Sequence, residues 1–376
     1  MDLDLDIPLP TATAVAEVSD TFTGPAALKL AFVGVGQAGG RIAATFRELG
    51  YRRVCAVNTT LADLAELTAL PEDCKLDIGQ ATGAAKDPQT AAALVADKGE
   101  DLFDLYRRSW GNQADQVLVC LAAGGGTGAG AHPKVIEVAQ RYLASCHQPV
   151  KIGAIVALPK EAEGYTLAKN AIGTLQTLRR LDVSPLLLLD NQQVLQLFNP
   201  VASREKTLAN STTAKLLHAF NQIAGSASAS QLGSTFDRAE LGKLLGGGVV
   251  AFGTYTCQNW ASGPALAAQI REELRKNMLA AVDLTQAQLA GLIYVVYGSA
   301  FDEVRAADLD YGAQMLSRML APGATVFQGL YHEMRAEPGV RVLVMVSGLP
   351  WPRDRLHQLA LGAGMSRDEL AKSLGV

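Results

Sequence analysis

The chain has 376 residues, 49% of them hydrophobic and 19% charged, and its 33 basic and 37 acidic side chains leave a formal net charge of −4. This length suits two domains with sizeable cores, and the balanced charge lacks the clustered basic residues expected of a protein that binds nucleic acid directly. No apolar run reaches the ~20 residues that cross a bilayer, and the acidic start MDLDLDIPLP lacks the basic segment of a secretory signal, so we expect a cytoplasmic protein.

The five cysteines and five histidines show no pairing or spacing typical of disulfides or metal sites. Most cysteines lie in apolar, strand-like segments, which indicates buried and reduced thiols. We therefore predict no metal ligands from the protein itself.

Residues 1–27 follow neither a helical nor a strand period and predict a flexible N-terminal arm. From residue 28 to residue 205, β-branched runs alternate with helical stretches, including one long helix near 90–108. The predicted strands read LKLAFVG, RRVCAVN, CKLDIG, DQVLVCLA, KIGAIVAL and PLLLLD. Strands that alternate with helices give right-handed crossovers and a parallel sheet. We predict an α/β fold with a doubly wound parallel sheet in this part.

The second half of the chain has a different organisation. A long central helix is predicted over 206–229, where apolar residues recur at helical spacing up to a serine- and glycine-rich junction. Residues 230–350 predict a smaller α+β domain with a mixed sheet. Residues 351–376 predict a polar helical tail.

A first glycine motif, GVGQAGG, stands where the first strand meets the first helix, at residues 34–40. Glycines there let backbone N–H groups approach a phosphate at a helix N-terminus. The motif fits the dinucleotide fingerprint, but such enzymes also carry an acid at the end of the second strand. Here that position reads Asn58-Thr59-Thr60, which weakens an NAD-dependent interpretation.

A second glycine motif, GGGTGAG, follows the buried strand DQVLVCLA and opens a helix at residues 124–130. A plain turn needs only one or two positive-φ positions, so five glycines in seven residues suggest backbone wrapped around an anion. Thr127 adds a hydroxyl donor. No GK[ST] follows, which excludes a P-loop NTPase.

These residues resemble the tubulin/FtsZ superfamily. GGGTGAG is similar to its GGGTG[ST]G signature, GVGQAGG lies between the first loops of FtsZ and tubulin, and CAVNT resembles the AVNTD of FtsZ. Thr60 replaces the aspartate of that pattern, and Leu167 stands where FtsZ has an arginine. The resemblance covers about residues 28–349 and implies a site for GTP or GDP with Mg²⁺ bridging the phosphates.

The resemblance implies nucleotide contacts from several further loops. Residues 83–88 match the loop that reads the γ-phosphate, although Lys86 is equally consistent with a solvated loop lysine; Glu163 matches the ribose loop, and Asn191 the base contact or simply a helix cap. The implied contacts are Gly36, Gln37, Ala38, Gly39, Asn58, Thr59, Gly83, Ala84, Ala85, Lys86, Gly124, Gly125, Gly126, Thr127, Gly128, Glu163, Asn191 and Asn210.

The catalytic acids of this family come from the next subunit, on a loop after the central helix. Here the loop reads Thr235-Phe236-Asp237-Arg238-Ala239-Glu240, with Thr235 in place of the asparagine of FtsZ. Asp237 and Glu240 are the candidate catalytic residues, because they share one face at a helix start and hydrolysis needs a group that positions water. The same two residues also fit a capping box, and the two roles are compatible.

The resemblance therefore implies a GTPase that polymerises head to tail with itself, and the tails are candidate sites for recruiting an adaptor protein. The C-terminal peptide of division FtsZ is missing, and Asp4–Pro8 is only faintly similar to it. Two alternatives stay open, a non-polymerising regulatory or scaffold member of the family and an NAD-dependent oxidoreductase. Cell division, DNA positioning and a cytoskeletal role in a bacterium all fit.

Overall fold

The computed structural model describes residues 26–79, 83–198, 205–225, 235–257, 260, 262–278, 280, 282–333 and 337–374. The predicted arm, apart from Ala26 and Ala27, and the predicted junction at 226–234 lie outside the described residues. The chain forms two compact units. The first contains Leu28–Gln192, Lys206–Ala214 and Trp351–Val376, and the second contains Met1–Ala27, Gln193–Glu205 and Lys215–Pro350.

The first unit is built on a parallel sheet in the order β3-β2-β1-β4-β5-β6. Its strands are β1 Leu30–Val35, β2 Val54–Asn58, β3 Lys75–Asp77, β4 Gln116–Ala122, β5 Ile152–Leu158 and β6 Leu186–Asp190. Most of these strand residues are apolar and buried, as in a sheet covered on both faces. The order reverses between β1 and β4, and this reversal is where doubly wound sheets bind their ligands.

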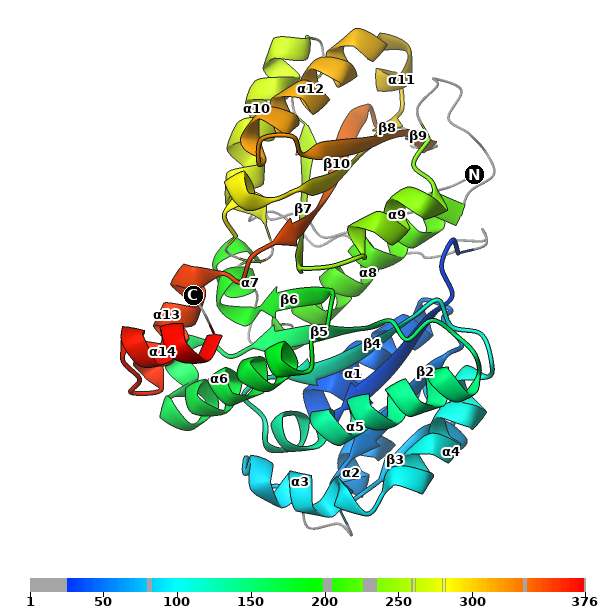
Figure 1. The fold of residues 1–376 in the computed structure, drawn as a ribbon. Coiled ribbons are helices and arrows are strands. Elements are labelled where there is room, and N and C mark those ends of the chain that lie inside the picture. The colour runs from blue at the N-terminus through cyan, green and yellow to red at the C-terminus, as the bar shows by residue number, and fades with distance from the viewer. Residues whose placement is uncertain are drawn as a thin grey trace. The chain divides into compact units, whose positions relative to one another are not determined.

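Helices connect these strands and cover the sheet (Figure 1). They are α1 Gly36–Glu48, α2 Leu61–Ala65, α3 Pro88–Ala96, α4 Gly99–Trp110, α5 Gly126–Ser145 and α6 Tyr165–Arg180, with the short 3-10 helices Glu72–Cys74 and Glu161–Glu163. The α/β, doubly wound fold predicted from the alternation of elements is confirmed. The single helix predicted near 90–108 is wrong: α3 ends at Ala96, and α4 starts at Gly99 after Asp97 and Lys98 leave helical geometry.

The C-terminal segment is part of the first unit, although its sequence predicts a tail. Its helices are α13 Arg353–Gly362 and α14 Arg367–Leu374, and both pack against α6. Their apolar faces are buried through Leu356, Leu359, Leu370 and Leu374. A buried apolar stripe of this kind holds a helix on a domain surface.

The second unit carries a mixed sheet in the order β7-β10-β8-β9. Its strands are β7 Val249–Cys257, β8 Leu289–Tyr297, β9 Thr325–Glu333 and β10 Gly339–Leu349. β10 runs antiparallel to β7 and β8, whereas β8 and β9 are parallel. The expected smaller α+β domain with a mixed sheet is confirmed.

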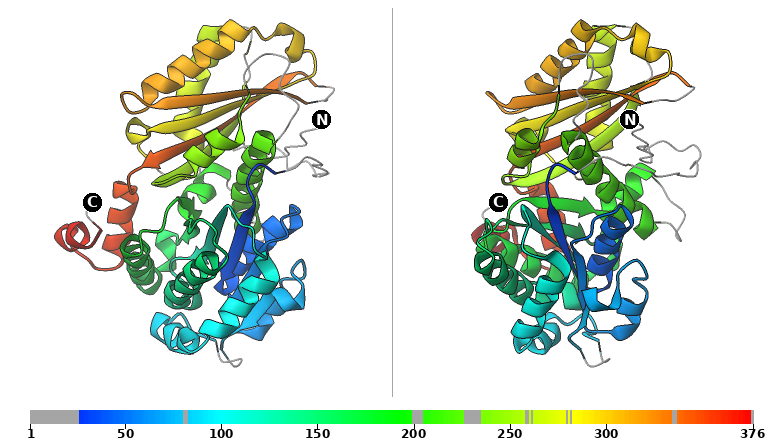
Figure 2. Two further views of the ribbon diagram at one scale, coloured as in Figure 1. Left: turned by 45° about the vertical axis from the view of Figure 1, so that its right-hand side comes forward. Right: turned by 90° about the vertical axis from the view of Figure 1, so that its right-hand side faces the viewer.

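The helices of the second unit are α9 Arg238–Leu244, α10 Gly263–Asn277, α11 Ala300–Glu303 and α12 Ala306–Met319, with a 3-10 helix at Leu284–Gln286. Figure 2 shows α10 and α12 side by side on one face of its sheet, and the two helices pack together. Two further helices, α7 Asn191–Phe198 and α8 Glu205–Gly225, contribute residues to both units.

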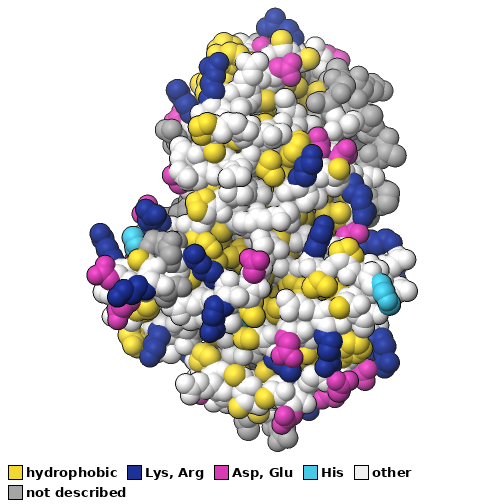
Figure 3. Space-filling view, in the orientation of Figure 1, with side chains coloured by type: hydrophobic (Ala, Val, Ile, Leu, Met, Phe, Trp, Pro, Cys, Tyr) yellow, Lys and Arg dark blue, Asp and Glu magenta, His cyan; other side chains and the backbone are white. Residues whose placement is uncertain are grey.

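Three further observations concern the surface charges, the hydropathy of the helices and the cysteines. On the face drawn in Figure 3, basic and acidic side chains are interspersed. None of the helices in the described segments combines the length and the apolar character needed to span a membrane. Cys55, Cys74, Cys120 and Cys257 are buried, as their apolar surroundings predict.

Candidate functional site

Two helices of the first unit begin next to each other at the carboxyl edge of the sheet. α1 starts at Gly36 directly after β1, and α5 starts at Gly126 after the short turn that follows β4. Gly36 has φ +74°, and a Cβ added there would lie 3.2 Å from both Thr127 Cβ and Gly128 N. The first N–H groups of a helix lack intrahelical partners and carry partial positive charge. Two such ends in contact form a site suited to an anion.

Most of the glycines in the second motif have a structural reason, because other parts of the chain occupy the space of a side chain. A Cβ on Gly130 would lie 2.0 Å from Pro88 O, and one on Gly126 would lie 2.8 Å from Asp87 N. A Cβ on Gly128 would lie 2.8 Å from Ala122 O. None of these glycines has a positive φ. The number of glycines alone is therefore weaker evidence for an anion than the sequence suggests.

Gly125 is different from the other glycines of this turn. A Cβ there would have only Ala122 O within 4 Å, at 3.8 Å, and Gly125 is the residue that precedes the first turn of α5. Its backbone is extended, with φ −77° and ψ 158°, so no conformational demand requires glycine. The open side of Gly125 is thus the part of the motif that fits close approach by a ligand.

Polar side chains join the 58–59 loop to both glycine motifs. Thr59 Oγ1 lies 2.8 Å from Thr127 Oγ1, and Asn58 Oδ1 accepts the N–H of Thr59 at 2.7 Å. Asp63 accepts from Asn58 Nδ2 at 3.0 Å and from Gln37 Nε2 at 2.8 Å. Sequence reasoning missed Asp63, whose only local signal is an acid in the first turn of α2.

The 83–88 loop is fastened to the second glycine motif. Asn170 Nδ2 on α6 donates to Lys86 O at 2.9 Å and to Gly124 O at 3.1 Å. Gly83, Ala85 and Lys86 have positive φ, which is strained for the last two residues, and Asp87 caps α3. The Lys86 side chain is exposed. The structure thus brings together the loops at 36–39, 58–59, 83–86 and 124–128. Sequence reasoning missed Asn170, which no local motif marks.

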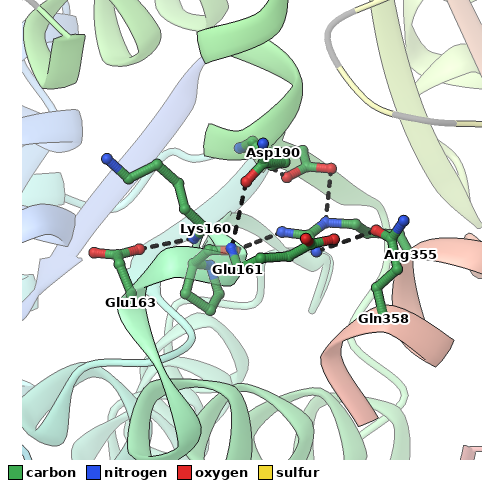
Figure 4. Close-up of polar contacts among 8 residues, drawn as sticks. Lys160, Glu161, Glu163, Asp190, Arg355 and Gln358 are labelled. Carbon is green, nitrogen blue, oxygen red and sulfur yellow. Dashed lines mark hydrogen bonds and ion pairs between the residues drawn. The ribbon is translucent and has the colours of Figure 1, made fainter. Parts of the chain in front are cut away.

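Glu163, Asn191 and Asn210 were predicted at the ribose and base end. Glu163 is exposed, and its Oε2 accepts the N–H of Lys160 at 2.7 Å, so it closes the turn at 160–163. Asn191 is half-buried at the start of α7, directly after β6, and Asn210 is half-buried on α8. Figure 4 shows Glu163 and Asp190 in one group of polar contacts that also includes Arg355 of α13.

Asp237 and Glu240 lie in the second unit at the start of α9. Asp237 Oδ1 accepts the N–H of Glu240 at 2.9 Å, and Glu240 Oε2 accepts the N–H of Asp237 at 3.0 Å. The capping box considered from the sequence is therefore present. Burial raises the pKa of Glu240, and the nearby Asp237 carboxylate adds to this rise. Asp237 itself is exposed.

A buried histidine stands one turn into α5. His132 Nδ1 lies 3.0 Å from Gly128 O, and burial lowers the pKa of His132 to about 4. The ring is therefore neutral at pH 7, and its contact supports the first turn of α5, a helix that contains Pro133. His132 contributes no positive charge to an anion at this edge.

Comparisons with known proteins agree with this geometry. Residues 29–199 match the model of the Tubulin/FtsZ family, GTPase domain. The tubulin-like protein CetZ4 of Haloferax volcanii is 32% identical over 175 residues, which are 44% of this chain and 43% of CetZ4. The alignments thus span less than half the length of the first curated relatives.

Solved structures share the fold over most of the chain. A GTPγS-bound protofilament of CetZ2 from Haloferax volcanii superposes with a TM-score of 0.72 at 20% identity, covering 93% of this chain and 100% of CetZ2. A GTPγS-form protofilament of Bacillus thuringiensis serovar israelensis TubZ gives 0.74 at 19% identity, covering 93% of each chain.

The curated relatives are mostly archaeal, so they do not support the expected bacterial source. They also argue against the NAD-dependent alternative, because the GxGxxG-like loop lies inside the region matched to a GTPase domain. The family model and the curated relatives together support membership of the tubulin/FtsZ superfamily, and residues 29–199 are the part of the chain that matches its GTPase domain.

Proposed function

We propose that this protein binds GTP at the carboxyl edge of the first unit, hydrolyses it and assembles head to tail into filaments. The observation that carries the proposal is the contact between the N-termini of α1 and α5, where Gly36 meets Thr127 at the reversal of strand order. The CetZ2 and TubZ structures described as GTPγS protofilaments support the nucleotide and the mode of assembly.

In this proposal the phosphates bind to backbone N–H groups of the two helix starts and to the Thr127 hydroxyl, which Thr59 orients. The 83–86 segment receives the γ-phosphate, Glu163 lies toward the ribose, and Asn191 and Asn210 contact the base. Each role uses a donor or acceptor type suited to its part of the nucleotide.

Mg²⁺ bound with GTP would neutralise charge on the phosphates. Within the described segments no group of three or more His, Cys, Asp or Glu side chains is placed to hold a metal. Mg²⁺ in nucleotide sites commonly keeps water and phosphate ligands, so a site of this type is compatible with the residues present.

Turnover would depend on Asp237 and Glu240 of the next subunit. The capping box holds both carboxylates at the start of α9, and the exposed Asp237 is free to face a neighbouring subunit. A carboxylate held in this way can orient the attacking water. A shared site of this kind makes hydrolysis a consequence of assembly.

Phosphate release measured against protein concentration tests the proposal, together with light scattering and negative-stain images in GTP and in GDP. We expect filaments with GTP, and turnover per subunit that rises steeply at the concentration where they appear. A constant turnover per subunit at all concentrations would contradict the shared site. Nucleotide binding without filaments would favour the non-polymerising alternative.

One structural observation favours that alternative. Leu167 stands where FtsZ has an arginine, and a Cβ on Gly124 would lie 3.0 Å from Leu167 Cβ. An apolar side chain therefore packs on the second glycine motif where the resemblance implies a charge. In this second candidate function the protein binds nucleotide and acts as a scaffold.

A further inference from the structure

The C-terminal helix α13 reaches the carboxyl ends of two neighbouring strands through one side chain. Arg355 Nε donates to Asp190 Oδ2 at 2.9 Å, and its terminal NH2 group donates to the carbonyl oxygen of Pro159. Asp190 is the last residue of β6, and Pro159 follows the last residue of β5. The side chains of Arg355 and Asp190 are only 3% and 2% exposed, so the pair is almost fully desolvated.

The contacts continue from this ion pair into both loops. Asp190 Oδ1 accepts the N–H of Gln192 at 3.1 Å, and Gln192 Oε1 accepts the N–H of Glu161 at 3.3 Å. Glu163 closes the same turn through Lys160 (Figure 4). Asn191 lies between two residues of this network, and Glu163 lies at its other end.

A buried ion pair is weak evidence for stability, because desolvation offsets much of the attraction between the charges. The guanidinium suits a different task, since its planar fork donates to two acceptors in a fixed geometry. Here the two acceptors belong to the ends of β5 and β6. One side chain thereby sets the positions of the 159–163 turn and the 190–192 segment relative to each other.

We propose that Arg355 is a positioning residue for the nucleoside end of the nucleotide, so that helix α13 is part of the nucleotide site. The inference rests on the proposed function, which places Glu163 at the ribose and Asn191 at the base. Arg355 acts through those loops and does not touch the ligand. The phosphate end, built from the N-termini of α1 and α5, does not depend on it.

The test compares two ligands that share phosphates but differ in the nucleoside. GTP and inorganic tripolyphosphate are titrated into the full chain and into Arg355→Met, Arg355→Lys and Arg353→Met. Arg353 is the matched control, because it is an exposed arginine at the first position of the same helix, two residues before Arg355. Thermal unfolding of each variant identifies the temperature range in which it is folded.

We expect Arg355→Met to weaken GTP binding roughly tenfold or more, the effect of losing well-placed hydrogen bonds, with tripolyphosphate affinity unchanged within about twofold. Arg355→Lys should give an intermediate GTP affinity, because an ammonium cannot reproduce the fork. Arg353→Met should resemble the parent. If Arg355→Met does not fold, Asp190→Asn serves as the second variant, since it removes the charge with little change in shape.

Unchanged GTP affinity in folded Arg355→Met and Asp190→Asn would overturn the inference. Equal losses for GTP and tripolyphosphate would also overturn it, because they would indicate general loosening of the unit. A parent protein that binds tripolyphosphate but not GTP would instead refute the proposed function, so the two failures are distinguishable.

Discussion

Replacing Asp237 with alanine is expected to reduce GTP turnover by about 10²–10⁴-fold while GTP binding stays intact. In the proposed mechanism the Asp237 carboxylate orients the water that attacks the nucleotide of the adjacent subunit, whereas the backbone of the first unit, to which Asp237 does not belong, binds the phosphates. Phosphate release is measured at a concentration where the parent protein forms filaments, and GTP binding is titrated separately.

The control separates catalysis from helix capping. Asp237 Oδ1 caps α9, and loss of a cap destabilises a protein by about 1 kcal/mol. Asp237→Asn keeps a capping oxygen but removes the charge, so it should lose turnover to a similar extent with normal stability. Asp283→Asn makes the same change at the cap of the 3-10 helix at Leu284–Gln286, and should turn over GTP normally. Full turnover in Asp237→Asn would remove the shared-site mechanism.

Alanine at two glycines of the GGGTGAG motif should affect two different properties, the stability of the fold at Gly130 and the GTP affinity at Gly125. Gly130→Ala places a methyl 2.0 Å from Pro88 O and 2.8 Å from Ala91 Cβ, so α3 and α5 must move apart. Overpacking of this kind destabilises by about 3 kcal/mol. Gly125→Ala has an open side and an ordinary φ, and should change the free energy of unfolding by less than about 0.5 kcal/mol.

The Gly125→Ala and Gly130→Ala variants also test where the ligand binds. In the proposed site a methyl on Gly125 would project toward the phosphates, so GTP affinity should fall about tenfold or more although the fold is intact. Denaturant unfolding and a GTP titration on both variants give the two quantities. A stable Gly130→Ala would refute the close packing of the 86–88 segment, and normal GTP affinity in Gly125→Ala would show that phosphate does not approach this turn.

Local sequence patterns predict the framework of the first unit well. Buried parallel strands are near-continuous apolar runs, and the glycine motifs fall where two of them lead into helices. The break between α3 and α4 escaped prediction because one helical period was assigned across Asp97 and Lys98, whose backbone leaves helical geometry. The docking of α13 escaped because its anchor, Arg355, pairs with Asp190, which lies 165 positions away.

In the candidate site too, local sequence patterns do not predict contacts between residues that are distant in the sequence. Gly126 and Gly130 are explained by backbone contact with residues 86–88, which lie far from them in sequence. Asn170 and Asp63 join loops through hydrogen bonds to partners that no spacing rule connects. Local periodicity reports which face of an element is buried, but it does not report which distant backbone that face meets.

The most direct test of the central claim is a calorimetric titration of the full chain with GTP, with NAD as the comparison ligand. The claim is that the N-termini of α1 and α5, meeting at Gly36 and Thr127, bind the phosphates of a guanine nucleotide. We predict saturable binding of GTP that Gly125→Ala weakens, and no saturable binding of NAD. Absence of GTP binding by the folded parent, or binding of NAD in its place, would contradict the account.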